Sequence, residues 1–551
     1  MPLAKYVFKP GINKEGTNYS NEGGWFDADK VRFRKGRPER IGGWQKQSTN
    51  SFIGTGRKIY TYKSSDGSNY ITLGTHQKLY VLEGNAYADI TPIRATTTNG
   101  ITFAATNGST TITATDSNHG AVAGDFVTIS EAVSLGGNIT ASVLNQEYQI
   151  DSVPNVNTFT FTATATANSS DTGNGGSAAD AVYQLNSGLD SYVQSTGWGA
   201  GTWGSGTWGS STSLSFTNQL RLWSIDNFGD DAVFNPRAGG IFFWDESSGT
   251  STRAVNATSL AGASDVPTTA LQVMVSDVDK HAIVFGCNPI GSSTLDPLLV
   301  RFSDKESITD WTPTAINQAG GVQLSMGSSI IGALQTRQEI LIWTDVGIVS
   351  MRFVGAPFVF SFNEVAHGPS LISPNAAVNA NNRVYFMDNG GFYVYSGSAQ
   401  RLPCTVLDYV LSDLNLGQAF KIFGAVNDSA NEIMWFYPSK DSDEIDRYVM
   451  FNYLENVWSI GTTSDNFVRT AWDEALILTN PIAASKNSST SNNNYIYAHE
   501  IGHGDDGSDF TAFIESSDFD LDPNGDKFIA VNKIIPDVQF RDQQSTSDSV
   551  T

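Results

Sequence analysis

Residues 447–461 have the sequence RYVMFNYLENVWSIG, in which an aromatic-rich strand meets a short polar turn and a second strand returns. This pattern predicts an antiparallel β-hairpin, because apolar and aromatic runs bounded by turn residues favour extended backbone. The same form recurs at three distant places: LYVLEGNAYADITP from residue 79, GIFFWDESSGTSTRAV from residue 240, and GFYVYSGSAQRL from residue 391. Repeated hairpins spread over several hundred residues favour a β-propeller over a single sandwich.

Helical periodicity is scarce in the chain. The best helix candidate is residues 406–416, VLDYVLSDLNL, where Leu407, Val410, Leu411 and Leu414 share one face. Most other segments are short apolar runs separated by clusters of Gly, Asn, Asp and Ser. We therefore predict a mainly β fold, with a β-propeller-like core of repeated antiparallel hairpins, an inserted small all-β domain and a C-terminal β segment. The spacing of the hairpins is irregular and fixes no blade number.

A change in composition marks the predicted insertion. Residues 96–190 are rich in Thr, Ala, Ser, Asn and Gly and alternate like a strand in TITAT from residue 111. A Trp-Gly tandem, GWGAGTWGSGTWGSS, follows from residue 197 and suits a linker whose indoles pack on a neighbour. The predicted organisation is an N-terminal segment with the first propeller strands (1–95), the inserted β domain (96–195), a Trp/Gly-rich linker (196–212), the main propeller body (213–480) and a C-terminal β segment (481–551).

Length and composition exclude several classes of protein. The chain has 551 residues, of which 16% are charged and 11% aromatic, so it has ample apolar surface to bury and is no disordered acidic tail. Cys287 and Cys404 are its only cysteines, which excludes a disulfide scaffold. No apolar run approaches 18 residues and the N-terminus has no apolar signal core, so we predict no membrane-spanning segment.

The charge is unevenly distributed. The formal net charge is −23, yet residues 1–60 hold 12 basic and 5 acidic residues, and no Lys or Arg occurs between Arg94 and Arg221. Because nucleic-acid binding requires cations that replace phosphate counterions, the acidic body is expected to repel DNA. The basic stretch is expected to form a strand with one solvated face, with a patch for phosphate or an acidic partner as the alternative. It comprises Lys30, Arg32, Arg34, Lys35, Arg37 and Arg40.

His499-Glu500-Ile501-Gly502-His503 matches the H-E-x-x-H pattern of zinc proteases. That pattern requires a helix, which brings both histidines to one ion, whereas here a strand leads in and glycines follow. In a strand, residues four apart lie about 13 Å from each other, too far to share an ion. Thr511 to Ile514 is expected to be the returning strand, with the histidines on either side of a hairpin turn. We therefore predict no zinc site here.

The remaining motifs favour structural roles. Asp520 to Asp526, DLDPNGD, begins like a calcium loop, but Val531 stands where the loop needs glutamate, so a hairpin turn at Asn524-Gly525 is expected. RFSD from Arg301 with Asp310-Trp311-Thr312 is only weakly similar to the Asp-box turns of sialidase-type propellers. Four isolated histidines are expected to be turn or packing residues: His76, His119, His281 and His367. We predict no catalytic, cofactor-binding or metal-binding residue.

Several long stretches resemble tail hub (nozzle) proteins of short-tailed bacteriophages, the packaged-DNA stabilisation protein family. The match opens with GINKEGTNYSNEGGWFDADKVRFRKGRPERIGGWQ from residue 11 and recurs along the chain outside 96–190. It continues in RFSDKESITDWTP (from 301), IIGALQTRQEILIWTDVGIVSMRFVGAPFVFSF (330), NEIMWFYPS (431), IDRYVMFNYLENVWSIG (445), YIYAHEIGHGDDGS (495) and FIESSDFDLDPNGDKF (513). The resemblance implies that relatives continue through a further β segment, so the chain is either a fragment or a short member.

The resemblance implies a structural protein of the virion and not an enzyme. Its copies would form a ring, expected to be a hexamer, below the portal and head-to-tail adaptor proteins, and would also contact tail fibre or tail tip proteins. Double-stranded DNA would be retained by the tail and pass through the lumen without sequence-specific binding. Because an acidic wall offers no phosphate contacts, we expect the lumen to be lined mainly by Asp and Glu. We expect the inserted domain to lie at the periphery or tip.

Two alternatives belong to other functional classes. One is a host-glycan-binding tail adhesin that uses the Trp-Gly segment and the inserted domain. The other is an enzyme, either a zinc protease at His499, Glu500 and His503 or a glycan-degrading propeller. Zinc content would separate the protease from the hub, since such an enzyme holds about one zinc per chain.

Overall fold

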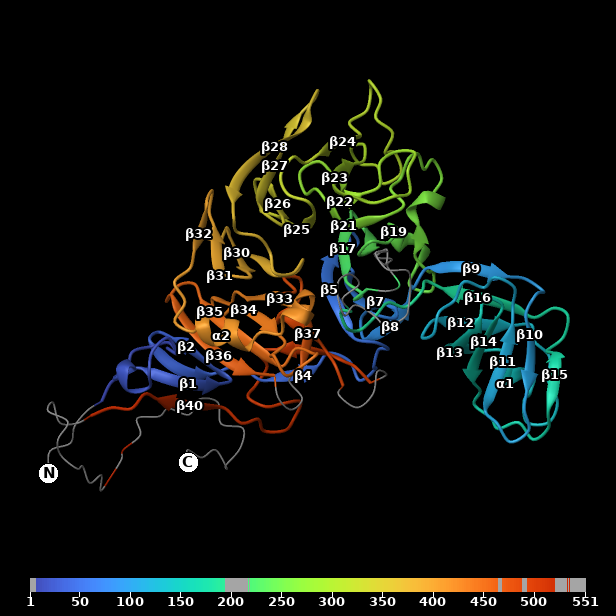
Figure 1. The fold of residues 1–551 in the computed structure, drawn as a ribbon, viewed down its shortest axis with the longest axis horizontal. Helices are drawn as coiled ribbons and strands as arrows, with labels where there is room; N and C mark the ends of the chain where they lie inside the picture. Colours follow the sequence, from blue (N-terminus) through green and yellow to red (C-terminus); the bar gives the residue numbers. More distant parts are fainter. Residues whose placement is uncertain are drawn as a thin grey trace, which may run out of the picture.

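Seven antiparallel sheets of four strands each form a seven-bladed β-propeller (Figure 1). In this computed structural model the described residues are 6–193, 217, 219–463, 468–487, 493–520, 533 and 535. The mainly β, propeller-like fold that the hairpins predict is thereby confirmed, and the blade number is added. No helix among the described ranges is long and apolar enough to cross a membrane.

Six of the seven blades are meanders of four consecutive strands. The first blade contains β5 (Gly56–Lys63), β6 (Asn69–Thr75), β7 (Leu79–Glu83) and β8 (Ala86–Asp89). The second contains β17 (Trp223–Phe228), β18 (Asp231–Pro236), β19 (Phe242–Trp244) and β20 (Val255–Asn256). The third contains β21 (Ala270–Val275), β22 (Ala282–Cys287), β23 (Asp296–Phe302) and β24 (Gly320–Gln323). The fourth contains β25 (Ile330–Gln335), β26 (Ile340–Thr344), β27 (Gly347–Gly355) and β28 (Val359–His367).

Of the last three blades, the seventh combines strands from both ends of the chain. The fifth contains β29 (Ala377–Ala380), β30 (Arg383–Asp388), β31 (Gly391–Tyr395) and β32 (Ala399–Arg401). The sixth contains β33 (Phe423–Asn427), β34 (Glu432–Tyr437), β35 (Arg447–Asn452) and β36 (Val457–Thr462). The seventh contains β37 (Arg469–Asp473), β38 (Ile482–Ser485), β39 (Ile496–His499) and, from the N-terminal segment, β4 (Trp44–Lys46). The ring is therefore closed by pairing of β4 with β39.

The seventh blade differs from the expected organisation of the C-terminal segment. β38 and β39 lie within 481–551 but belong to the propeller, because β4 supplies their missing edge partner. The strand expected to return from His499 at Thr511 to Ile514 is a wrong assignment: β40 (Phe513–Ser516) pairs with β1 (Trp25–Asp29) and not with β39. The predicted hairpins are present, and the one helix predicted from periodicity corresponds to α2 (Leu407–Asp413).

The basic stretch is more buried than its sequence indicates. It forms the hairpin of β2 (Val31–Arg34) and β3 (Arg37–Arg40) against the sixth blade, after a short 3-10 helix η1 (Tyr19–Asn21) and β1. Lys30 and Arg32 are buried, as are the alternating apolar residues Val31 and Phe33, so the expected solvated face of β2 is wrong. The reason is electrostatic: Lys30 pairs with Asp29 and Arg32 pairs with Glu432 and Glu500, so the buried cations have partners.

A separate β domain is inserted between the first and second blades and lies beside the propeller (Figure 1). It has its own hydrophobic core and contains β9 (Ile93–Thr97), β10 (Thr102–Ala105), β11 (Thr111–Thr115), β12 (Phe126–Ser130), α1 (Ala141–Leu144), β13 (Glu147–Asn155), β14 (Thr158–Thr162), β15 (Asp171–Asn174) and β16 (Asp180–Gln184). Lys78 of the propeller fixes it: Nζ lies 2.5 Å from Glu147, 2.8 Å from Asp89 and above the Phe126 ring.

Two sequence predictions lie outside the described residues. These are the packing of the Trp/Gly-rich linker at 196–212 and the hairpin turn at Asn524-Gly525. A few further elements complete the described chain: the 3-10 helices η2 (Glu246–Ser248), η3 (Ala257–Ser259) and η4 (Leu416–Lys421).

Substitution of Trp44 tests the closure of the ring. Trp44 is buried, its indole Nε1 donates to Asp505 at 2.6 Å, and its ring stacks on Phe510. We expect Trp44→Ala to lower the free energy of unfolding by about 3–5 kcal/mol, as for other large-to-small core changes. Tyr19→Ala, at an exposed aromatic of the same segment, is the matched control and should change it by less than about 0.5 kcal/mol. Equal effects in urea unfolding would contradict the role assigned to β4.

Candidate functional site

The inner strands of the seven blades surround an axial channel of about 410 Å³, which is the candidate functional site. Neighbouring inner strands run in the same direction: Ser224 Oγ accepts from the Val273 amide at 2.9 Å, and two residues on Asp226 Oδ2 accepts from Val275 at 2.8 Å. The first residues of these strands therefore meet at one end of the channel and the last residues at the other. The middle of the wall is largely apolar, with Val273, Ala333, Val378, Ala425 and Ala471.

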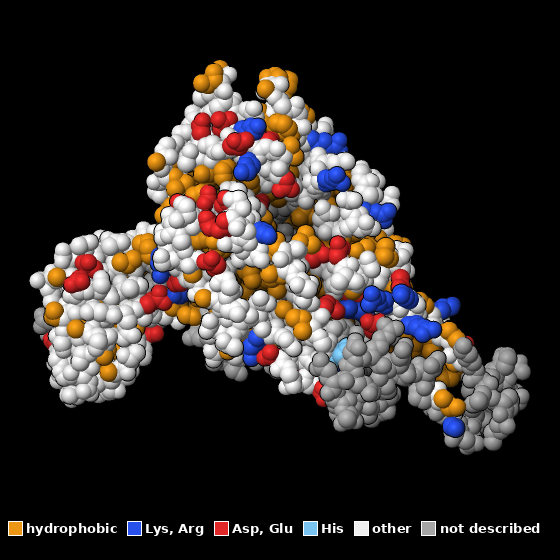
Figure 2. Space-filling model, turned by 180° about the vertical axis from the view of Figure 1, so that it is seen from behind, with side chains coloured by type: hydrophobic (Ala, Val, Ile, Leu, Met, Phe, Trp, Pro, Cys, Tyr) orange, Lys and Arg blue, Asp and Glu red, His pale blue; other side chains and the backbone are white. Residues whose placement is uncertain are grey.

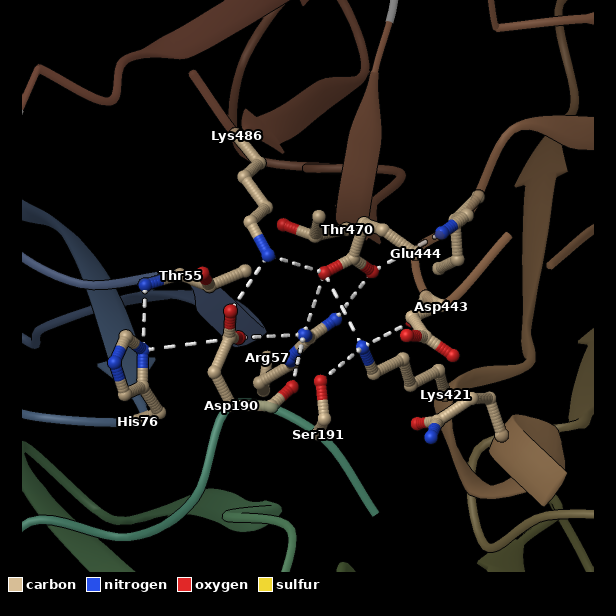
Figure 3. A network of polar contacts seen from close by, with 12 residues as sticks. Thr55, Arg57, His76, Asp190, Ser191, Lys421, Asp443, Glu444, Thr470 and Lys486 are labelled. Carbon is tan, nitrogen blue, oxygen red and sulfur yellow. Dashed lines mark hydrogen bonds and ion pairs between the residues drawn. The ribbon is translucent and has the colours of Figure 1, made fainter. Parts of the chain in front are cut away.

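One end of the channel is crossed by residues 185–193, which we call the strap (Figure 3). The strap returns from the inserted domain, and its Asp190 accepts hydrogen bonds from Arg57 at 2.7 Å and from Lys486 at 2.6 Å. Arg57 also donates both terminal nitrogens to Glu444, at 2.9 and 2.8 Å, and Lys486 reaches the same carboxylate at 2.8 Å. Two acidic and two basic groups from four distant segments thus form one network.

The strap makes further contacts with the sixth blade. Lys421 Nζ lies 3.3 Å from the Ser191 hydroxyl and 3.5 Å from Glu444. The backbone of Tyr192 exchanges two hydrogen bonds with the Gln418 side chain, and the Tyr192 ring stacks on Phe420 at 5.6 Å. These contacts hold the strap across the propeller from the first blade to the sixth and seventh.

The charges of the network shift the pKa values of its members. Burial opposes ionisation of Glu444, but Arg57, Lys421 and Lys486 together outweigh it and lower the pKa of Glu444 to about 2. The pKa of Asp190 is also lowered, again against burial, by Arg57 and the neighbouring cations. Burial lowers the pKa of His76 to about 4, and its Nδ1 accepts from the Thr55 amide, so this imidazole is neutral. Both carboxylates are therefore ionised well below neutral pH.

Arg237 lines the channel near the strap. Its terminal nitrogens lie 3.5 and 3.4 Å from the carbonyl oxygens of Leu271 and Ile330, and its guanidinium lies over the Phe420 ring. Burial lowers its pKa to about 10. Together with Arg57 it places positive charge at the strap end of the channel.

The opposite end, which we call the mouth, carries acidic side chains at the ends of the inner strands. Asp226 accepts hydrogen bonds from the Tyr60 hydroxyl at 3.0 Å and from two backbone amides, and burial raises its pKa to about 6. Burial also raises the pKa of Asp473 and lowers that of Lys58, which share the channel wall. Asp277 and Glu474 complete the acidic wall. The channel therefore has a basic end and an acidic end.

The H-E-x-x-H residues are not brought together around an ion site. His499 ends β39 and is buried, with its Nε2 accepting from Arg469 Nε at 2.9 Å. Since arginine only donates, the lone pair that a metal would need is occupied. Glu500 pairs with Arg32, at 2.8 and 2.5 Å, and His503 is exposed. Among the described residues, no group of three His, Cys, Asp or Glu could hold a metal ion.

The other residues that the sequence motifs singled out make contacts typical of structural residues. Arg301 is buried in β23 and donates to carbonyl oxygens of Asn288 and Asp265, while Trp311 is buried in the same blade. His281 is buried with its Nδ1 2.7 Å from a carbonyl oxygen, and His119 accepts from the Ala121 amide through Nδ1. His367 is exposed beside Glu364, and Asp520 is the last residue described before the predicted turn.

Sequence reasoning missed the strap and both ends of the channel. Arg57 and Lys58 are adjacent in β5 and both line the channel, and Arg57 also joins the strap network. The only available signal was Asp190, the last of the eight acidic residues between Arg94 and Arg221, standing immediately before the Trp-Gly linker. No alternation pattern could have paired it with Glu444 or Lys486, which lie more than 250 residues away.

Comparison with known proteins identifies no family for the chain. No protein-family profile and no curated protein matches the sequence. Similar solved structures include AztD from Citrobacter koseri (9% identity, 85% of this chain and 98% of that chain, TM-score 0.30) and PorZ of Porphyromonas gingivalis (11%, 96% and 60%, 0.27). A third is the phage phi92 endosialidase (10% identity, 97% of this chain and 81% of that chain, TM-score 0.19). Likenesses of this size carry no argument about function.

Acid titration tests the strap network. A carboxylate whose folded pKa is lowered stabilises the protein above its unfolded pKa, and this contribution is lost as pH falls through the folded value. We therefore expect the free energy of unfolding in urea to fall between about pH 5 and pH 2, and Asp190→Asn to flatten this slope. At pH 7, Asp190→Asn should lower it by about 3 kcal/mol, because Arg57 and Lys486 lose a buried partner.

The neighbouring Asp443 offers the control for this experiment. Its side chain is exposed, and Lys421 contacts only its backbone oxygen. Asp443→Asn should therefore leave both the stability at pH 7 and its dependence on pH unchanged. A wild-type slope that Asp190→Asn does not alter would contradict the role of the network.

Paired substitutions test the structural role of the H-E-x-x-H residues. Glu500→Gln removes the charge that meets Arg32 and should lower the free energy of unfolding by about 2 kcal/mol. His503→Ala changes an exposed side chain and should alter it by less than about 0.5 kcal/mol. In a zinc protease, by contrast, His503→Ala would release the metal and Glu500→Gln would remove the catalytic base. About one zinc per purified chain, lost in His503→Ala, would overturn the structural assignment.

Proposed function

We propose that this chain is a structural subunit of the tail of a short-tailed bacteriophage. In this proposal its copies form a hexameric ring below the portal and head-to-tail adaptor, retain the packaged DNA and form the channel for its ejection. The chain acts in the virion, contacts tail fibre or tail tip proteins, and has neither an enzymatic activity nor a cofactor.

The observation that carries the proposal is the distribution of the stretches that resemble tail hub proteins. They contribute β1 to β4, β25 to β28, and strands of the third, sixth and seventh blades. The resemblance therefore reaches four of the seven blades, including the two strands that close the ring, and is not limited to one attached module. A propeller of this family is the simplest interpretation of such a spread.

The small volume of the propeller channel supports a role of the whole propeller as part of a wall around the DNA. A cavity of about 410 Å³ has the size of a small-ligand pocket, and the strap crosses one of its ends. Duplex DNA cannot pass through such a channel. In this proposal the DNA therefore passes between copies of the chain, through a lumen that the ring encloses.

Surface charge supports assembly by complementary faces. Figure 2 shows Lys and Arg gathered over the N-terminal strands, where Arg34, Lys35, Arg37 and Arg40 are exposed. The remaining 491 residues carry 51 acidic and 21 basic residues. A ring needs a heterologous interface that closes on itself, and a basic patch meeting an acidic neighbour would fix its direction. The proposed lumen is lined mainly by the acidic side chains.

Quantitative mass spectrometry of purified virions tests the proposal. We expect this chain to be present at half the copy number of a twelve-fold portal protein, because a hexameric ring would sit below it. A structure of the assembled tail should then show Asp and Glu lining the lumen. Absence of the chain from the particle would overturn the tail assignment, and a continuous basic lumen would overturn the expected wall.

A further inference from the structure

Arg237 is a cation in the wall of the axial channel whose charge has no counterion. Its guanidinium donates only to the carbonyl oxygens of Leu271 and Ile330, at 3.5 and 3.4 Å. Since a guanidinium carries five N–H donors, three of them have no acceptor in the described part of the chain. No acidic side chain of the described residues forms an ion pair with Arg237, and burial is the only influence on its pKa.

Other enclosed arginines of this protein are neutralised. Arg57, at the same end of the channel, and Arg32, beside the sixth blade, each meet two carboxylates. Charges that are removed from bulk water are normally paired, because an unpaired ion loses its hydration without compensation. Arg237 has no such partner, so its position favours an anion that comes from outside the described chain.

The guanidinium of Arg237 is held in place by its surroundings. The Phe420 ring lies 5.8 Å from it, and Tyr192 of the strap stacks on the same ring at 5.6 Å. These contacts and the two carbonyl oxygens restrict the side chain, which lowers the entropy that a ligand must remove. A planar carboxylate suits the remaining donors, because a guanidinium can donate two parallel N–H bonds to it.

The charges along the channel give an anion one preferred end. The acidic residues that line the channel stand at the mouth: Asp226, Asp277, Asp473 and Glu474. At the strap end, the nearby carboxylates of Asp190 and Glu444 are already paired with Arg57 and Lys486. An anion in the channel is therefore repelled at the mouth and attracted to Arg237.

The wall beside Arg237 is apolar. Leu222 and Leu371 are buried and stand just before the inner strands β17 and β29, and Leu271 belongs to the inner strand β21. Val273 and Ala333 continue this surface toward the middle of the channel. A volume of about 410 Å³ exceeds what a carboxylate group fills, so an apolar chain attached to it has room along this wall.

We propose that the strap end of the channel binds a small monocarboxylate with an apolar body, with Arg237 as its counterion and Leu222, Leu271 and Leu371 against its body. The carboxylate comes either from a free aliphatic acid or from the C-terminus of a short apolar peptide. This inference is independent of the proposed tail function, because it concerns the purified single chain.

Calorimetric titration of the full chain at constant ionic strength tests the proposal. The probes are octanoate, octanol and octylammonium, which share a chain length and differ in charge, and acetyl-Leu-Leu with a free C-terminus. We expect octanoate to bind at least about tenfold more tightly than octanol, and octylammonium more weakly than either. Tighter binding of acetyl-Leu-Leu than of octanoate identifies a peptide as the source, and the reverse identifies a free acid. Equal binding of octanoate and octanol, or no binding at millimolar concentration, overturns the proposal.

Arg237→Met separates a binding role from a structural one. This substitution keeps an unbranched side chain, and we expect it to weaken octanoate at least about tenfold while octanol binds as before. Without ligand, the variant should unfold at the same or a higher urea concentration, because it removes an uncompensated charge. A loss of stability with unchanged octanoate affinity would show that Arg237 only supports the fold and would overturn the proposal. If the variant fails to fold, the ranking of octanoate, octanol and octylammonium on the natural chain decides.

Two further cations serve as controls. Arg337 is exposed and does not line the channel, so Arg337→Met removes the same charge and should leave the octanoate affinity unchanged. Lys58 lines the channel but is attracted by Asp473 and Asp226, so Lys58→Met should weaken octanoate less than Arg237→Met does. An equal loss in Arg337→Met would indicate general electrostatic attraction, and a larger loss in Lys58→Met would place the anion at the mouth. Either result would contradict the assigned site.

Discussion

Pairing of β4 with β39 is the contact on which the propeller depends, because it completes the last blade of the ring with a strand from the other end of the chain. Strand pairing brings together residues 44–46 and 497–499, which are separated by almost the whole chain. Arg32 strengthens the same junction by meeting Glu432 of the sixth blade and Glu500 after the seventh. Burial and the charge of Glu500 raise the pKa of Glu432 to about 8, against the opposing effect of Arg32. Contacts of such sequence separation carry a large loop-closure entropy and slow folding.

The channel has a basic end and an acidic end because the inner strands of the blades run in the same direction. Each inner strand begins at the strap end and ends at the mouth, so residues at equivalent positions accumulate at the same end. Arg57 and Arg237 stand at one end, whereas Asp226, Asp277 and Asp473 stand at the other. Side chains also tie neighbouring blades together: Gln272 exchanges two hydrogen bonds with the Ala333 backbone, and Trp472 donates to the Val426 carbonyl. The axial space is therefore lined by the same residues that fix one blade against the next.

The sequence predicts the mainly β fold of repeated hairpins, but it does not predict which charged residues form ion pairs. Hairpins such as residues 447–461 are local, since alternation and turn residues specify them without any distant contact. The ring closure is not local, and for this reason β38 and β39 were assigned to a separate segment. The solvated face expected for the basic stretch is wrong for a related reason. Arg32 is buried because it pairs with Glu432 and Glu500, which lie hundreds of residues away. Ion pairs between residues hundreds of positions apart leave no periodicity, so Asp190 with Arg57, Glu444 and Lys486 could not be predicted.

The strap gives the inserted domain a mechanical connection to the centre of the molecule. The domain leaves the propeller after β8 and returns through residues 185–193, which end in the Arg57 network. The domain is therefore attached to the propeller at two places. One is formed by the Lys78 contacts at its base, and the other by the ion pairs of the strap. Because the strap directly follows β16, a displacement of the domain would be transmitted to the ion pairs at the end of the channel.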